Sequence, residues 1–470
     1  MTAIDVELDP RGQGDDAPWH VKGSRAPVPD EVTLTELEVK GSIPSDLTGR
    51  YIRNTPNPRT GWTEHWFLGD GMLHGIEIAD GKANWYRNRW VRTPMFDNPG
   101  ADRTTLALNA ETLTMDHSVS AANTHIIGHG GKLLALEEGA FPYEVTKELD
   151  TVGAWTFDGK LDGPFTAHPK FCPDTGEMLA FSYRQFPPYL TYYRVSPDGK
   201  MVQQSEITVG GPTMMHDFAA SRNHVIFMDL PIVFDLEEAM KGGMPMHWSD
   251  EYPARMGVMP RHGTDADMKW FDIDPCYVFH TLNAHDDGDE VVMYGCRSER
   301  IWDESNQIEF DDGADAPAMV PQLTEWRFNM ATGHVSETRV DEAGCEFPRV
   351  ADSVQGHKSK VGYTIGLGGV GQDSDGMTGQ LFKWDMQSGA KEVFAFPDGH
   401  ECGEPVFVPS ADAGNEDDGY VMCYAYQTQT DTSYLAIIDA TDFTAGPIAE
   451  IHVPRRIPAG FHGSWIPDAT

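Results

Sequence analysis

The chain has 470 residues and a formal net charge of −38 at pH 7. Such an excess of acidic side chains repels phosphate backbones and anionic lipid head groups, which excludes nucleic acid as a partner and excludes docking through a basic membrane patch. The six cysteines show no CxxC spacing, no apolar run of about 18 residues is present, and no signal segment precedes the fold, so the sequence predicts a cytoplasmic protein without a transmembrane segment.

Residues 1–30 are polar and rich in Asp, Gly and Pro, which is typical of a loosely held N-terminal arm. In the remaining residues, 31–470, glycine and proline are spread throughout the sequence rather than clustered. This distribution is typical of many short strands joined by tight turns. We therefore expect a single all-β catalytic domain over residues 31–470.

One local pattern recurs along this domain: a turn containing Gly, Asn or Asp, followed by a short apolar or alternating strand. It recurs every ~45–75 residues, as expected for propeller blades of about four strands, some with insertions. The seven turns are Gly69-Asp70-Gly71, Gly130-Gly131, Gly176, Asn223, Gly288, Gly362 and Gly419. The pattern predicts a β-propeller.

Three stretches are longer than a blade requires, near residues 90–123, 234–272 and 300–322. We expect these insertions to form a cap of helices and loops on one face of the propeller. Within the second stretch, residues 234–240 are predicted to form a short helix that ends at Gly242-Gly243.

Four of the eighteen histidines lie in apolar or strand-edge surroundings, and they come from widely separated parts of the chain: His168, His216, His280 and His462. A single histidine in such a setting is more often packed or exposed than a ligand. A closed β-fold, however, brings the inner strands of successive blades to one axis. Four neutral imidazoles meeting there would form a metal site, and four nitrogens accept zinc and copper as well as iron.

Ligand histidines commonly donate their second ring N–H to a carboxylate, which fixes the tautomer. Three glutamates lie in strand or turn settings that hold few other charges: Glu138, Glu346 and Glu404. We expect these carboxylates to support the histidines.

Ten short motifs then make a resemblance specific. They are IRNTPNP (52–58), HWFLGDGMLHG (65–75), NTHII (123–127), GGKLLALEEG (130–139), FTAHPK (165–170), MHDF (215–218), FHTLNAHDDGD (279–289), EFPRV (346–350), GEPVFVP (403–409) and FHGSW (461–465). Through them, nearly the whole chain resembles the carotenoid cleavage oxygenase family. Four longer stretches are most similar to a bacterial group that acts on carotenoids and apocarotenoids: residues 85–93, 149–153, 252–261 and 270–280.

The resemblance implies a seven-bladed propeller with a dome of helices and loops over an axial non-haem Fe(II). It assigns the four histidines as iron ligands and assigns Glu138, Glu346 and Glu404 as the hydrogen-bond partners of three of them. It also places Thr124 against an open coordination position, although a strand threonine in an ordinary ladder is an equally good interpretation from the sequence alone.

The same resemblance assigns Phe67, Met214 and Phe279 to the walls of a substrate cavity, positions that ordinary core residues also occupy. Glu137 marks a departure from one branch of the family. Stilbene-cleaving members tend to carry a lysine at this point, where it engages a phenol oxygen, and a carboxylate cannot do the same for a phenolate. We therefore count Glu137 among the candidate substrate-binding residues and as an argument against stilbenes.

These observations predict an iron oxygenase that cleaves one C=C bond of a carotenoid or apocarotenoid with O₂ to give two carbonyl products. One alternative within the class is cleavage of stilbene or phenylpropene substrates. Two further alternatives are a propeller hydrolase with axial Ca²⁺, which requires oxygen ligands, and an interaction propeller without catalysis. The expected partners are O₂ and an apolar polyene, with peripheral membrane contact through the dome possible and no oligomeric state assigned.

Overall fold

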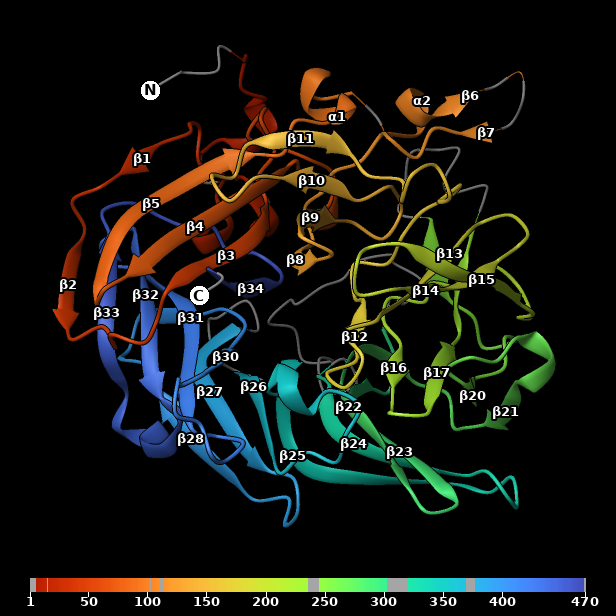
Figure 1. The fold of residues 1–470 in the computed structure, drawn as a ribbon. Coiled ribbons are helices and arrows are strands. Elements are labelled where there is room, and N and C mark those ends of the chain that lie inside the picture. The colour runs from red at the N-terminus through yellow and green to blue at the C-terminus, as the bar shows by residue number, and fades with distance from the viewer. Residues whose placement is uncertain are drawn as a thin grey trace. The chain divides into compact units, whose positions relative to one another are not determined.

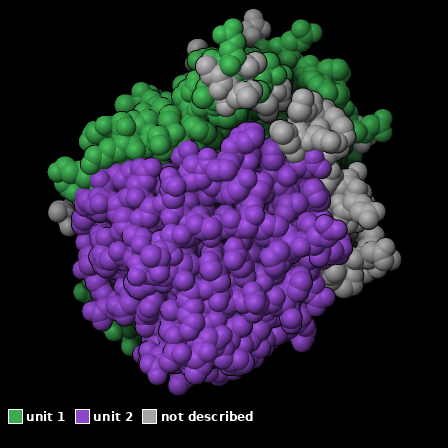
Figure 2. Space-filling model, turned by 90° about the vertical axis from the view of Figure 1, so that its right-hand side faces the viewer, with its two compact units in different colours: residues 1–167, 198–200, 394–470 green, residues 168–197, 201–393 purple. Residues whose placement is uncertain are grey.

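The structure is a computed structural model that describes residues 6–14, 16–101, 103–109, 111, 114–235, 245–301, 320–368 and 377–468. Strands dominate its secondary structure (Figure 1). The chain divides into two compact units, coloured separately in Figure 2. Unit 1 comprises residues 1–167, 198–200 and 394–470, and unit 2 comprises residues 168–197 and 201–393. The single catalytic domain over 31–470 stays a prediction.

Unit 1 contains three antiparallel sheets of four or more strands. The first is β1 (Thr33–Leu34), β5 (Lys82–Trp90), β4 (Gly71–Ala79), β3 (Gly49–Pro56) and β34 (Gly463–Pro467). The second is β11 (Thr151–Ala154), β10 (Tyr143–Val145), β9 (Lys132–Leu136) and β8 (His125–His129). The third is β2 (Glu38–Gly41), β33 (Pro447–Val453), β32 (Thr432–Asp439), β31 (Gly419–Gln427) and β29 (His400–Cys402), with β30 (Val406–Pro409) also paired to β31.

In two of these sheets, N-terminal and C-terminal strands pair with each other. β3 pairs with β34 from Gly49 opposite Pro467 to Arg53 opposite Gly463. β2 pairs with β33 in the same antiparallel manner. Neither sheet is therefore complete until strands from both ends of the chain have met.

Unit 2 contains the remaining large sheets. One is β12 (Lys170–Phe171), β13 (Met178–Tyr183), β14 (Leu190–Val195) and β15 (Met201–Ile207). The next is β16 (Ala219–Ala220), β17 (His224–Asp229), β20 (Arg255–Pro260) and β21 (Lys269–Asp272). The last has seven strands: β22 (Tyr277–Asp287), β23 (Glu290–Ser298), β24 (Gln322–Asn329), β25 (Val335–Arg349), β26 (Val361–Leu367), β27 (Met377–Asp385) and β28 (Lys391–Ala395), which ends in unit 1.

The strand β25 is shared by two four-stranded parts of that last sheet. Its residues up to Gly344 pair with β24, and its residues from Cys345 onward pair with β26. The described residues therefore form seven groups of four or more strands. Each of the seven sequence turns lies within two residues of the start of one strand in its own group, namely β4, β9, β13, β17, β23, β26 and β31. A strand therefore follows each predicted turn, with one such strand in each group.

Within unit 1, apolar clusters lie between neighbouring groups of strands. Tyr51 and Ile52 are neighbours on β3, and because successive side chains of a strand point to opposite faces, they belong to two different clusters. The first cluster joins β3 and β4 to β31 and β32, and the second joins them to β8 and β9. With both faces covered, every residue of β3 is buried. This face-to-face packing of sheets holds the strand ends that carry the candidate site.

Helices are short. The α-helices are α1 (Pro94–Asp97) and α2 (Arg103–Ala107), and the 3₁₀ helices are η1 (Pro10–Gly12), η2 (Trp19–Val21), η3 (Gly23–Arg25), η4 (Trp66–Leu68), η5 (Asp265–Asp267), η7 (Asp352–Val354) and η8 (Ala440–Ala445). Among the described residues, none of these helices has the length and apolar character needed to cross a bilayer.

The predicted insertions contain the two small hairpins and both α-helices. Residues 90–123 contain α1, α2 and the hairpin β6 (Leu108–Asn109) with β7 (Thr114–Met115). Residues 234–272 contain part of the hairpin β18 (Ile232–Phe234) with β19 (Met246–Trp248). The helix predicted at 234–240 is wrong for Phe234, which ends strand β18, and residues 236–240 lie outside the described residues, as does most of the 300–322 insertion.

The N-terminal arm is not loose over its second half. Val21, Arg25 and Val28 are buried. The backbone of Val28 exchanges two hydrogen bonds with the Asn57 side chain, at 2.8 and 2.9 Å. The expectation of a loose arm is therefore wrong for residues 17–28, because their apolar side chains find a surface of unit 1 that the local sequence does not reveal.

Candidate metal centre

Three of the four candidate histidines lie in or just before the first strands of three groups in unit 2. His168 precedes β12 by two residues, His216 precedes β16 by three, and His280 lies within β22. All three are buried, with 6 to 9% of their surface exposed. Each of these three groups thus has one histidine near its first strand, although only His280 lies within the strand itself.

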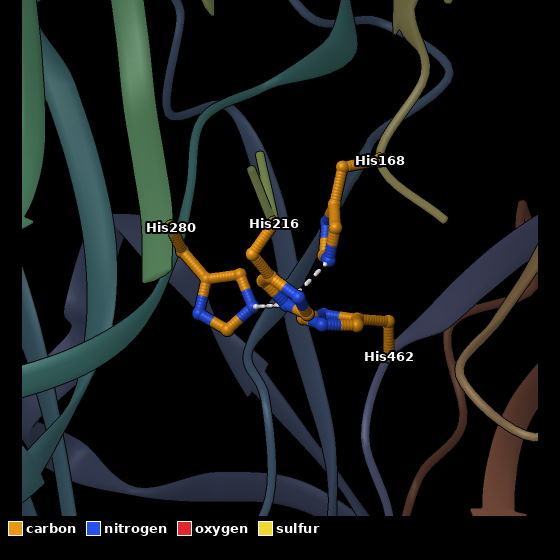
Figure 3. A group of neighbouring side chains, drawn as sticks. All are labelled: His168, His216, His280 and His462. Carbon is orange, nitrogen blue, oxygen red and sulfur yellow. Dashed lines mark hydrogen bonds between the residues drawn. The ribbon is translucent and has the colours of Figure 1, made fainter. Parts of the chain in front are cut away.

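The imidazoles of these three residues point toward one another (Figure 3). The Nε2 atom of His216 lies 3.0 Å from that of His168 and 3.2 Å from that of His280. Adjacent nitrogen ligands about 2.1 Å from an octahedral ion are separated by about 3.0 Å. The three nitrogens are therefore spaced as ligands of one metal ion.

His462 belongs to unit 1, where it immediately precedes β34 and is 4% exposed. It is the fourth member of the group in Figure 3, in which one ligand atom of each imidazole lies within 4.8 Å of the others. All four donors are nitrogen. Such a set suits a transition metal, whereas Ca²⁺ and Mg²⁺ require oxygen ligands.

Two of the imidazoles are hydrogen-bonded to glutamate carboxylates through Nδ1. The Nδ1–H of His280 donates to Oε2 of Glu346 at 2.6 Å, and that of His462 donates to Oε1 of Glu404 at 2.9 Å. A proton on Nδ1 leaves the Nε2 lone pair free to bind a metal. Glu404 also accepts the backbone N–H of Gly463 at 2.9 Å.

The backbone of β25 explains how Glu346 reaches His280. The β25–β26 register shifts between Glu346 and Arg349, and Phe347 adopts a φ of 52°, in the left-handed region. This bulge re-aims the side chains of the strand. The Phe347 ring then stacks on the His280 ring, with centroids 5.4 Å apart.

The remaining predicted residues of the site occupy these positions. Glu138 follows β9 in unit 1 and is half-buried. Thr124 precedes β8; its hydroxyl donates to Oδ1 of Asn123 at 2.9 Å, and its carbonyl accepts the backbone N–H of His462 at 3.0 Å. Thr124 therefore adjoins His462 through the backbone. The roles assigned to both residues stay predictions.

Aromatic rings surround the histidines. In unit 1 the Phe67 ring lies 5.5 Å from that of Phe461, the residue before His462, and 4.7 Å from that of His65. Burial lowers the pKa of His65 to about 4, so this ring is neutral at pH 7. In unit 2 the Phe279 ring lies 5.3 Å from that of His216. The Phe279 contact gives the His216 imidazole an aromatic neighbour.

Met214 is 3% exposed and lies two residues before His216. Its backbone N–H donates to the Ile232 carbonyl at 2.8 Å, and its own carbonyl accepts the Tyr277 hydroxyl at 3.3 Å. The backbone on the approach to His216 is therefore fixed on both sides. The cavity-lining roles of Phe67, Met214 and Phe279 stay predictions.

Glu137 is buried, and its carboxylate is fully engaged within unit 1. Oε1 accepts from Arg103 of α2 at 2.5 Å and from the Gly139 backbone at 3.0 Å. Oε2 accepts from the Ser120 hydroxyl at 3.1 Å and from the Ala121 backbone at 3.2 Å. Glu137 thus joins the 90–123 insertion to the end of β9.

Replacing Arg103 with methionine is expected to lower the free energy of unfolding by about 2 kcal/mol. The Glu137 carboxylate would stay buried and would lose its only cationic partner among the described residues. The expected loss of stability is moderate because the Arg103 side chain is 25% exposed, so solvent already screens part of the ion pair. Urea denaturation measures the change. Glu137→Gln/Arg103→Met, which removes both charges, is the control and should recover part of the loss; equal stability of Arg103→Met and the parent would contradict the expectation.

Sequence reasoning missed two residues beside the ligands. Asp217 follows His216 and is fully buried, and His125 is 8% exposed with its ring 5.2 Å from that of His462. A charged residue inside the apolar MHDF motif was a signal for Asp217. For His125 the NTHII motif offered nothing that separates a packed histidine from a functional one.

The class of this protein follows from its similarity to known proteins. A family model described as retinal pigment epithelial membrane protein, RPE65, matches residues 25–467. A carotenoid cleavage oxygenase of Mycobacterium tuberculosis is 38% identical, and the match covers 95% of this chain and 97% of that protein. A carotenoid 9,10(9′,10′)-cleavage dioxygenase of Crocus sativus is 35% identical over 95% of this chain and 89% of its own.

Solved structures are similar over nearly the whole chain. The lignostilbene dioxygenase of Pseudomonas brassicacearum has a TM-score of 0.84 and 29% identity, covering 96% of this chain and 98% of its own. Cobalt-substituted Synechocystis ACO has a TM-score of 0.83 and 25% identity, covering 94% and 97%. These likenesses define the class, a seven-bladed β-propeller oxygenase, and confirm the predicted fold and enzyme class. The chain belongs to the RPE65/carotenoid cleavage oxygenase family.

Proposed function

We propose that the chain holds one Fe(II) through His168, His216, His280 and His462 and cleaves one C=C bond of a carotenoid or apocarotenoid. The reaction consumes one O₂ and gives two carbonyl products, one from each carbon of the broken bond. The observation that carries the proposal is a set of buried imidazoles whose Nε2 atoms face one another, while carboxylates accept the Nδ1 protons of His280 and His462.

The donor set fits ferrous iron. Neutral nitrogen ligands suit iron, zinc and copper alike, and membership of a family of oxygenases argues against redox-inactive zinc. The choice of iron over copper rests on the family resemblance. Bound iron supplies the binding and activation of O₂. Four protein ligands leave two positions of an octahedral ion for other molecules. The axial Ca²⁺ alternative is disfavoured because the four candidate ligands are imidazoles.

The chain's own residues bind and orient the substrate. Phe67 and Phe461 in unit 1, with Met214 and Phe279 in unit 2, provide apolar and aromatic surface near the imidazoles. A rigid polyene held along such surface presents one double bond repeatedly in the same place. In this proposal no protein nucleophile or general base takes part.

Two observations favour carotenoids over stilbenes. The curated relatives at 38% and 35% identity are named for carotenoid cleavage, whereas the lignostilbene enzyme is 29% identical. Glu137 stands where stilbene-cleaving members tend to carry lysine, and its carboxylate already has four donors, among them Arg103. It therefore offers no cation to a phenolate. Stilbene or phenylpropene cleavage by the same site is the second candidate, supported by the likeness to that solved structure.

The decisive experiment is anaerobic reconstitution with ferrous iron, followed by O₂ and a panel of β-apocarotenals, carotenoids and hydroxystilbenes. Mass spectrometry should find paired carbonyl products from the polyenes and unchanged hydroxystilbenes. With ¹⁸O₂, each product should carry one labelled oxygen. Products from the hydroxystilbenes alone would transfer the assignment to the second candidate.

Removing the metal should abolish cleavage. A chelator that strips ferrous iron is expected to reduce turnover to background, because no side chain replaces the activation of O₂. Reloading with Fe(II) should restore turnover, and reloading with Zn(II), which has no redox chemistry, should not. Full activity of the stripped protein would contradict an iron enzyme and favour the non-catalytic interaction propeller.

A further inference from the structure

Asp217 is the most deeply buried charged group next to a proposed ligand in unit 2. Its side chain is 1% exposed. Oδ1 lies 2.7 Å from Nζ of Lys170 and accepts the backbone N–H of Phe218 at 2.7 Å. Oδ2 accepts the backbone N–H and the hydroxyl of Thr281, each at 2.8 Å. Four donors therefore converge on one carboxylate.

These donors belong to all three histidine-bearing segments of unit 2. Lys170 lies two residues after His168, Asp217 immediately follows His216, and Thr281 immediately follows His280. One side chain thus joins the three segments within one or two residues of each imidazole.

The segments need such a tie because their strands are short or irregular. β12 and β16 have only two residues each, so their ladders provide two paired positions apiece. In β22 the register shifts on both sides of Thr281. A bulge of this kind disrupts the local ladder, and Asp217 accepts the backbone N–H of Thr281 there. Backbone pairing alone therefore leaves the three imidazoles weakly fixed relative to one another.

Lys170 balances the buried charge. Its side chain is 13% exposed, and its ammonium is the cationic partner of the carboxylate. A buried carboxylate with a cation and three further donors is satisfied and therefore rigid.

We propose that Asp217, with Lys170 and Thr281, is a positioning residue that sets the spacing of His168, His216 and His280 and thereby the metal affinity. This inference rests on the proposed metal site and deepens it. A carboxylate that touches no metal holds the three donors at the separation that one ion requires.

The test is Asp217→Asn in the full-length chain. The amide keeps one acceptor oxygen, and its NH₂ group faces donors that an oxygen accepted before. The hydrogen bonds that join the three segments are therefore weakened, while the four candidate ligands stay unchanged. The affinity for Co(II) or Fe(II) should fall about 10- to 100-fold, as for other groups that orient metal ligands. Titration of the metal-free protein, followed by the Co(II) absorption spectrum and chelator competition, measures this without substrate.

Asp286→Asn is the matched control. Asp286 lies on the same strand as His280 and accepts from Ser221 at 3.0 Å, from Asn223 at 3.0 Å and from His224 at 2.6 Å. It joins segments of unit 2 as Asp217 does, but it is farther along the sequence from any proposed ligand. Its replacement should lower the stability of the fold and leave the metal affinity unchanged.

Thr281→Val is the second variant, in case Asp217→Asn does not fold. It removes one of the four donors and keeps the β-branched shape, so metal affinity should fall several-fold, and Thr281→Ser should restore it. Folded Asp217→Asn and Thr281→Val proteins that bind metal as tightly as the parent would overturn the inference alone. A parent chain that binds neither metal would instead overturn the proposed function.

Discussion

His216→Ala is expected to abolish both iron retention and polyene cleavage while leaving a folded protein. His216 is the central imidazole of unit 2, because its Nε2 lies 3.0 Å from that of His168 and 3.2 Å from that of His280. Removing it deletes one ligand and opens a gap between the other two. The residue precedes β16 and lies outside every strand, so the sheets lose no ladder hydrogen bond.

Metal analysis after desalting, turnover and circular dichroism would be measured together. His334→Ala is the control, since His334 is an exposed histidine of the same unit that lies beyond the end of β24. It should retain iron, turnover and secondary structure. Undiminished iron in His216→Ala would refute the assignment of the ligands.

The second large effect is expected for Glu404→Leu. Glu404 is 2% exposed and accepts from Nδ1 of His462 and from the Gly463 backbone, both at 2.9 Å. An apolar side chain leaves both donors without an acceptor, which costs about 1–3 kcal/mol of stability for each. It also frees the His462 ring to rotate and change tautomer, so metal affinity should fall by about 10- to 100-fold.

The stability and the metal affinity of Glu404→Gln should lie between those of Glu404→Leu and those of the parent, because the single amide oxygen can accept from only one of the two donors. Thermal unfolding of the metal-free protein measures the stability change, and Co(II) titration measures the affinity. Glu450→Gln is the control. Glu450 forms another glutamate–histidine pair of unit 1, 2.8 Å from Nε2 of His452, but it lies on β33. Equal metal affinity of Glu404→Leu and Glu450→Gln would contradict a supporting role for Glu404.

The sequence predicted the features that depend on local patterns. A Gly, Asn or Asp turn before an apolar run signals a strand wherever it occurs, and all seven such runs are strands of separate groups. The histidines stood out because His168, His216, His280 and His462 lie among apolar residues. The choice of iron for the proposed metal required the family resemblance, since nitrogen donors alone accept several ions.

The contacts that the sequence could not predict join residues far apart in the chain. Asp217 meets Thr281 across 64 positions, and Glu137 meets Arg103 across 34. No periodicity links such residues, because the partners are chosen by how strands and insertions pack. The prediction of a loose arm was wrong over residues 17–28 for the same reason. The sequence shows that these residues have few apolar side chains, but it does not show the surface of unit 1 against which they pack.

The pairing of β3 with β34 has a consequence for the order of events during biosynthesis. β3 emerges early from the ribosome, yet its partner, residues 463–467, is translated more than 400 positions later, immediately after His462. Until then the first sheet has an open edge, and the proposed fourth nitrogen does not exist. In the proposed site, binding of iron by all four histidines would therefore be a late step that follows translation of this strand.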